Sequence, residues 1–123
     1  MSKLSSEIQQ RLDTELNLWL ATVRPDGRPH LTPVWFAWYE EKFYACIQAK
    51  SVKTDNIEQN PQVALSLEDG SHPIICEGMA TFVAEPWPEA VAAIFRHKYD
   101  WDIFADGEYD RLLAIAPVKW LSW

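Results

Sequence analysis

The stretch FYACIQAKSVKTDNIEQNPQVALSL, residues 43–67, contains the signals for a strand, a helix and a second strand in direct succession. Aromatic, apolar and small residues fill residues 42–49, which is typical of a strand. Ser51 is a favoured N-cap residue, so VKTDNIEQN is expected to form a helix. The pair Asn60-Pro61 ends that helix, because the residue before a proline avoids helical dihedral angles. Residues 62–67 are then the next strand.

The segment before this stretch predicts a helix followed by a hairpin. The expected elements are a helix over residues 5–16, a strand over 18–23, a tight turn at the PDG of 25–27 and a strand over 30–39. Pro29 and Pro33 lack the amide donor that a strand ladder needs. These two prolines therefore indicate a sheet edge or a bulge.

The segment after it predicts one long strand, a helix, an acidic loop and a last strand. The expected elements are a strand over residues 73–84, a helix beginning at Pro86, a loop over 100–110 and a strand over 111–120. Gly78 marks a bend or bulge inside the first of these strands. Six strands with short turns and helices between them predict a single α+β domain, residues 1–123, built on a small antiparallel barrel.

The composition excludes several classes of protein. With 48% hydrophobic and 24% charged residues, the chain has the balance of a globular protein rather than a disordered one. A net charge of −7 disfavours a nucleic-acid partner, and no apolar run is long enough for a membrane helix. The start MSKLSSEIQQ does not resemble a signal peptide. Cys46 and Cys76 lie in apolar runs, which favours buried thiols and a cytoplasmic location.

The charge is unevenly distributed. Residues 24–53 hold five basic and three acidic side chains, although acidic residues dominate the rest of the chain. A basic island in an acidic protein suggests a small anionic ligand more than a polyanion. Chance clustering of lysines and arginines on a solvated face is the alternative.

Most common catalytic and cofactor motifs are absent. The chain has only four glycines, so neither GxGxxG nor a P-loop is present. The three histidines lie far apart in sequence, and no metal site is expected. Cys46 lies in an apolar strand, where an inert thiol is the usual case. No nucleophile elbow is present, and the paired carboxylates fall in turns. No catalytic side chain is therefore assigned.

The remaining candidate is AKSVKTDNI, residues 49–57, where a strand ends and a capped helix begins. The first turn of a helix exposes unpaired amides and a partial positive charge. Lys50 and Lys53 flank Ser51 there, and a phosphate would satisfy the amides, the hydroxyl and both ammonium groups. In the alternative interpretation, both lysines point into water and Asp55 balances their charge.

The order of these motifs resembles the FMN-binding split-barrel family, which is related to pyridoxamine 5′-phosphate oxidase. The resemblance is carried by LATVRPDGRPHLTPVWF, by FYACIQAKSVKTDNIEQNPQVALSL and by ICEGMATF, between residues 20 and 82. It implies a six-stranded antiparallel split β-barrel with flanking helices. It also implies a homodimer with one FMN in each of two clefts at the dimer interface.

The same resemblance assigns roles to individual residues. The strand whose backbone faces the flavin ring is matched by Thr32, Pro33, Val34 and Trp35. Positions next to the ring or the ribityl chain are matched by Ile47 and Gln48. The phosphate-binding corner is matched by Lys50, Ser51 and Lys53, with Lys53 the closest match. Trp120 could approach the cleft from the partner chain, or serve only as an interface anchor. The seven tryptophans and the apolar C-terminal strand independently favour a homodimer.

Departures from the family pattern leave the reaction open. The oxidase has an arginine where Thr32 stands and a lysine where Ala37 stands, and it continues into a substrate-binding segment that VKWLSW lacks. Oxidation of vitamin B6 is therefore not expected, and the small-molecule substrate is unknown. Short relatives with a TPVWF strand include deazaflavin-dependent reductases. The alternatives to an FMN-dependent oxidoreductase are such a reductase, or a flavin- or haem-binding protein without turnover.

Overall fold

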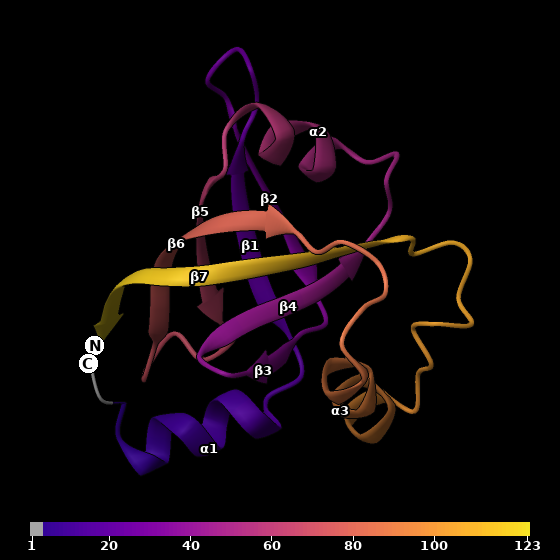
Figure 1. Ribbon diagram of the computed structural model, residues 1–123. Coiled ribbons are helices and arrows are strands. Elements are labelled where there is room, and N and C mark those ends of the chain that lie inside the picture. The colour runs from indigo at the N-terminus through magenta and orange to yellow at the C-terminus, as the bar shows by residue number, and fades with distance from the viewer. Residues whose placement is uncertain (1–3) are drawn as a thin grey trace.

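The computed structural model describes residues 4–123, so the first three residues of the predicted domain lie outside the described part (Figure 1). Its elements are α1 (Ser6–Thr14), β1 (Leu18–Val23), β2 (Pro29–Val34), β3 (Ala37–Tyr39), β4 (Lys42–Ile47), α2 (Val52–Gln59), β5 (Gln62–Leu67), β6 (Ile74–Phe82), α3 (Glu89–Tyr99) and β7 (Arg111–Ser122). The predicted α+β split barrel is confirmed. The described residues contain no helix long and apolar enough to cross a membrane.

The strands form one antiparallel sheet in the order β2-β1-β5-β6-β7-β4-β3. The two outermost strands, β2 and β3, are joined in the chain by Trp35 and Phe36 alone. Such a short connection spans only about 10 Å, so the two edges of the sheet must come close together. The sheet therefore curls into an incompletely closed barrel, as Figure 1 shows.

The strand count corrects the prediction: the sheet has seven strands, not six. The single strand expected over residues 30–39 is broken after Val34, so that β2 pairs with β1 and β3 pairs with β4. Phe36 is fully buried at the break. Its N–H donates to the Tyr99 hydroxyl at 3.0 Å, and its carbonyl accepts from Lys98 Nζ at 2.9 Å. Side chains of α3 thus replace the ladder bonds that the strand gives up.

Several predicted boundaries also change. The first helix ends at Thr14 rather than at residue 16, and β4 ends at Ile47, two residues before the predicted end. Helix α3 begins at Glu89 rather than at Pro86. The last strand runs on to Ser122, since its far end pairs with the start of β6. Other predictions are confirmed: β2 is an edge strand, and Cys46 and Cys76 are free and buried.

Alternate residues of the strands fill the barrel. In β1, Leu18, Leu20 and Thr22 face inward and are buried. Phe36 and Phe43 pack in the same core, with ring centroids 5.9 Å apart. A smaller apolar cluster lies between the sheet and α3 and includes Ala37, Cys46, Val91, Phe95, Ile103 and Leu112. Helix α3 is therefore fixed beside β3 and β4, where it can reach the break between β2 and β3.

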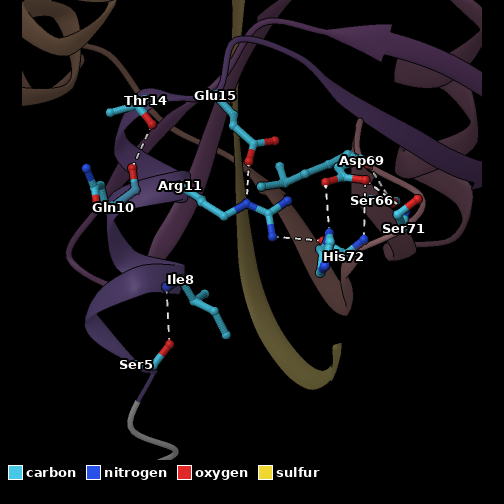
Figure 2. A network of polar contacts seen from close by, with 11 residues as sticks. Ser5, Ile8, Gln10, Arg11, Thr14, Glu15, Ser66, Asp69, Ser71 and His72 are labelled. Carbon is cyan, nitrogen blue, oxygen red and sulfur yellow. Dashed lines mark hydrogen bonds and ion pairs between the residues drawn. The ribbon is translucent and has the colours of Figure 1, made fainter. Parts of the chain in front are cut away.

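Helix α1 is held against the loop between β5 and β6 by polar contacts, shown in Figure 2. Ser5 caps the helix by accepting from the Ile8 amide at 3.2 Å. Arg11 pairs with Glu15 and donates to the His72 carbonyl at 2.8 Å. Asp69 accepts from the amides of Ser71 and His72, which fixes the loop that Arg11 reaches. These contacts lie at the end of the barrel opposite α2 (Figure 1).

The expected irregularity at Gly78 is confirmed as a shift in the β6–β7 register between Glu77 and Gly78. A Cβ atom at Gly78 would lie 2.7 Å from the Ala116 carbonyl oxygen and 2.8 Å from Ile115 Cγ2. We expect Gly78→Ala to lower the free energy of unfolding by about 1–3 kcal/mol, because a backbone atom cannot move aside cheaply. Urea unfolding measures this loss.

Gly107→Ala is the matched control for this substitution. A Cβ atom there would meet no described atom within 4 Å. Its stability should stay within about 0.5 kcal/mol of wild type. If the two variants were equally stable, close approach of β7 would not be the reason for glycine at residue 78.

Candidate functional site

A cavity of about 440 Å³ opens where β2 and β4 end and α2 begins. This volume lies in the usual range for small-molecule sites. Residues from β2, β4, α2 and the 100–110 segment line it, and all of these come together only in the curled sheet. The lining residues are Asn17, Pro33, Val34, Trp35, Cys46, Ile47, Gln48, Lys53, Trp101, Asp106 and Tyr109.

Lys53 is the basic side chain of this cavity. It lies in the first turn of α2 and is half-buried. Burial lowers the pKa of its ammonium group below the ordinary value, because removal from water disfavours the charged form. An anionic ligand would offset that cost. The structure places Lys53 in the cavity lining at the first turn of α2.

Ser51 is the N-cap of α2, as expected, and its hydroxyl is already engaged. Its oxygen accepts from the Thr54 amide at 3.3 Å and donates its proton to the Gln48 carbonyl at 2.9 Å. The Thr54 hydroxyl donates to the same carbonyl at 2.6 Å. The donors left for an anion are the amides of Val52 and Lys53, which have no acceptor inside the helix. Ser51 thus fixes the start of α2 and, with it, the direction of the Val52 and Lys53 amides.

Two buried polar atoms beside this corner have no hydrogen-bond partner among residues 4–123: His30 Nδ1 and Thr32 Oγ1. Both side chains project from the inner face of β2, opposite Thr22 and Leu20 of β1. Asn56 of α2 donates to Thr22 Oγ1 at 3.0 Å and so fixes the helix over this face. Unpaired buried polar atoms are rare and costly, which points to a missing ligand.

The positive charge of Lys53 also acts on His30. Burial lowers the pKa of His30, and the positive charges of Arg24 and Lys53 lower it further. Lys53 also lines the cavity together with Pro33 and Val34, the two residues that follow Thr32 in β2. An ammonium group, a hydroxyl and a ring nitrogen in this part of the molecule are the kinds of donor from which a phosphate accepts hydrogen bonds. The residues present fit the phosphate of a flavin cofactor.

His30 is a candidate site residue that the sequence did not single out, because isolated histidines indicate neither a metal site nor a phosphate site. The signal that could have identified it is the alternation of His30 and Thr32 on one face of an edge strand, within the basic island. Among the described residues, no group of three His, Cys, Asp or Glu side chains is arranged to hold a metal ion.

Most of the other predicted residues lie in the lining of the cavity or beside it, and Lys50 does not. Pro33, Val34, Trp35, Ile47 and Gln48 line the cavity together with Lys53. Thr32 lies beside it, as described above. Lys50 is exposed and is not part of the lining.

Trp120 lies far from this cavity within a single chain. It packs against Trp38 and Phe43, with centroid distances of 5.8 Å to each, and borders a different hollow near Glu40. The start of β7 at Arg111 pairs with Ile47 at the cavity. At about 3.3 Å per residue, Trp120 lies about 30 Å further along the strand. This cavity could therefore be approached only by the Trp120 of a second copy of the chain.

Cys46 lines the cavity but is not a nucleophile. Its thiol donates to the Tyr109 carbonyl at 3.1 Å. Burial, followed by the charges of Asp106 and Asp110, raises the pKa of this thiol to about 12. The sulfur therefore stays protonated at neutral pH, and thiolate chemistry is not available.

The fold and the cavity together define a split-barrel protein with a corner suited to a phosphate-bearing cofactor. The sequence profile of the family described as Pyridoxamine 5′-phosphate oxidase matches residues 4–123. The chain belongs to this family. No curated protein gives a significant match.

Solved structures with the same fold carry different functions. An F420 reductase has 28% sequence identity and a TM-score of 0.76, and the match covers 96% of this chain and 98% of the reductase. A conserved hypothetical protein from Mycobacterium tuberculosis has 27% identity and a TM-score of 0.82, with 100% and 86% of the two chains covered. The haem storage protein HutZ from Vibrio cholerae has 21% identity and a TM-score of 0.81, with 98% and 95% covered, which shows the fold alone.

Proposed function

We propose that this protein binds FMN in the cavity and acts as an oxidoreductase on a small-molecule substrate. The observation that carries this proposal is the pair of buried, unpartnered atoms, His30 Nδ1 and Thr32 Oγ1, beside Lys53. These groups match a phosphate in charge and in hydrogen bonding. The residues alone indicate only a phosphate-bearing ligand. We infer that this ligand is a flavin from the family to which the chain belongs.

Each part of the cavity has a role in holding the cofactor. Lys53, Thr32 and the first amides of α2 bind the phosphate. Val34 and Ile47 are buried and exclude water from one side of the cavity. Bound FMN supplies hydride and electron transfer, and the protein contributes position and electrostatics. No side chain is assigned as an acid or a base.

The experiment is to identify the cofactor of the freshly purified protein and then to test its turnover. We expect a flavin absorbance spectrum, release of FMN on denaturation, and bleaching of the bound flavin by a nicotinamide donor. Reoxidation by candidate acceptors would follow. A colourless protein that does not quench FMN fluorescence would contradict the proposal. A protein that holds FMN but is never reduced would be a binding protein.

A deazaflavin-dependent reductase is the second candidate, favoured by the 28% identity to an F420 reductase over nearly the whole chain. A deazaflavin also carries a ribityl phosphate, so the same corner would serve. The released cofactor distinguishes the two candidates by its absorbance and mass. A Soret band in the purified protein would instead indicate haem.

His30, whose Nδ1 atom is buried, gives a pH-dependent prediction. A bound phosphate favours protonated His30, so its pKa should be higher in the complex than in the free protein, where burial lowers it. By linkage, FMN affinity must then rise as pH falls between these two pKa values. Between about pH 8 and about pH 5.5, the affinity ratio of wild type to His30→Gln should therefore increase as the pH falls.

Titration of the phosphate itself affects both proteins equally, so its effect cancels in this ratio. Fluorescence-quenching titrations at each pH measure it. Riboflavin, which lacks the phosphate, is the control ligand and should give a constant ratio. A constant ratio for FMN as well would remove His30 from the phosphate site.

We also propose that the protein is a homodimer, assembled through the outer face of the sheet. Trp19 of β1, Leu31 of β2 and Val118 of β7 point away from the core and are 41%, 60% and 71% exposed. Met79 borders a hollow of about 420 Å³ on this face, together with Val118. Contiguous exposed apolar surface of this kind usually marks an interface. Sedimentation should give a dimer at micromolar concentration, and a monomer would contradict the proposal.

A further inference from the structure

Besides Lys53, the cavity has a second distinctive lining, an aromatic wall made of Trp35, Trp101 and Tyr109. Trp35 and Trp101 meet edge to face, with ring centroids 5.7 Å apart. Trp101 and Tyr109 meet in the same way at 5.6 Å. Behind the wall, Tyr99 of α3 stacks on Trp35 at 4.5 Å with an interplanar angle of 6°.

The aromatic wall is fixed before any ligand binds. Asp106 Oδ2 accepts from Trp101 Nε1 at 2.8 Å, and Asp106 Oδ1 accepts from the amides of Glu108 and Tyr109 at 2.9 and 3.1 Å. The rings are nevertheless accessible, since Trp35 is 46% and Tyr109 is 38% exposed. An exposed aromatic surface that the fold holds rigid is suited to stacking a planar ring, because little entropy is lost on binding.

Carboxylates surround the aromatic wall. Glu108 accepts from Gln48 Nε2 at 3.3 Å, and Asp110 accepts from the Ala49 amide at 2.7 Å, so both stand at the cavity's rim. Burial raises the pKa of the Cys46 thiol inside the cavity, and the nearby charges of Asp106 and Asp110 raise it further. In the described part of the chain, Lys53 is the only basic residue of the lining. Three carboxylates therefore lie at or beside the aromatic wall, against one lysine in the lining.

We propose that the aromatic wall is the substrate subsite and that it takes a planar aromatic ring that is neutral or cationic. This inference rests on the proposed function, because it places the ring beside bound FMN. Stacking and cation–π attraction favour such a ring, and the carboxylates repel an anionic one. The acidic 100–110 segment thereby selects the substrate by charge.

The test uses three probes of one shape: 1-methylquinolinium, quinoline and quinoline sulfonate. Equilibrium dialysis against FMN-loaded protein should give affinities that fall in this order, with the sulfonate at least about tenfold weaker than the cation. Tyr109→Leu should weaken binding of the cation about tenfold, because one stacking face is lost, whereas Tyr109→Phe should retain it. Glu108→Gln should reduce the difference in affinity between 1-methylquinolinium and quinoline sulfonate.

Phe104→Leu is the matched control: it changes an exposed ring of the same segment that stacks on Trp87 outside the cavity lining, and should leave probe affinity unchanged. Equal affinities for the three probes, or no effect of Tyr109→Leu, would overturn the inference. On FMN-free protein, displacement of bound 1-methylquinolinium by added FMN would also overturn it, since the wall would then hold the flavin ring. If no FMN is taken up, the proposed function fails, and the same titrations on FMN-free protein still decide the ring preference.

Discussion

Lys53→Ala should weaken FMN binding about ten- to hundredfold while leaving riboflavin binding unchanged. The substitution removes a charge-assisted hydrogen bond to the phosphate, worth roughly 1.5–3 kcal/mol. The half-buried position of Lys53 places this bond away from bulk water, so added salt should reduce the effect only in part. Flavin-quenching titrations with FMN and with riboflavin measure both affinities.

Lys42→Ala is the matched control, since Lys42 is exposed at the start of β4 and lines no part of the cavity. It should bind FMN and riboflavin as wild type does. Equal FMN affinity for wild type and Lys53→Ala would refute the phosphate assignment. A loss of affinity for both flavins would instead mean that Lys53 supports the shape of the cavity.

Phe36→Ala should lower the free energy of unfolding by about 3–5 kcal/mol, a large part of the 5–15 kcal/mol typical of a domain. Phe36 has no exposed surface and packs against Phe43 at the break between β2 and β3. The Lys98 ammonium lies 3.9 Å from the centre of its ring, and this contact is lost as well. Urea unfolding followed by circular dichroism gives the change in midpoint at constant slope.

Phe104→Ala makes the same chemical change at a ring that is 49% exposed, and should cost less than about 1 kcal/mol. Phe36→Leu keeps most of the buried volume, so it should fold and lose less stability than Phe36→Ala. Comparable losses at Phe36 and Phe104 would show that the break between the strands is not held by packing.

The sequence by itself determined the features that depend on neighbouring residues. Ser51 caps α2 through the Thr54 amide, and the helix stops before Pro61. The prolines of β2 indicated an edge strand, and Gly78 indicated the irregularity in β6. In each case the cause is local: a cap reaches three residues along the chain, and a proline or glycine acts on its own backbone. Such features can be predicted without knowledge of the fold.

The tertiary structure alone decided the break after Val34, the unpaired atoms of His30 and Thr32, and the aromatic wall. The groups that satisfy Phe36 come from Lys98 and Tyr99, about 60 residues away in the chain. Whether a polar atom on β2 finds a partner depends on which helix covers the strand, and strand periodicity does not contain that information. Trp101 likewise meets Trp35 only after the sheet has curled and α3 has packed beside it. Contacts between distant segments are set by closure of the whole barrel, so no local pattern in the sequence predicts them.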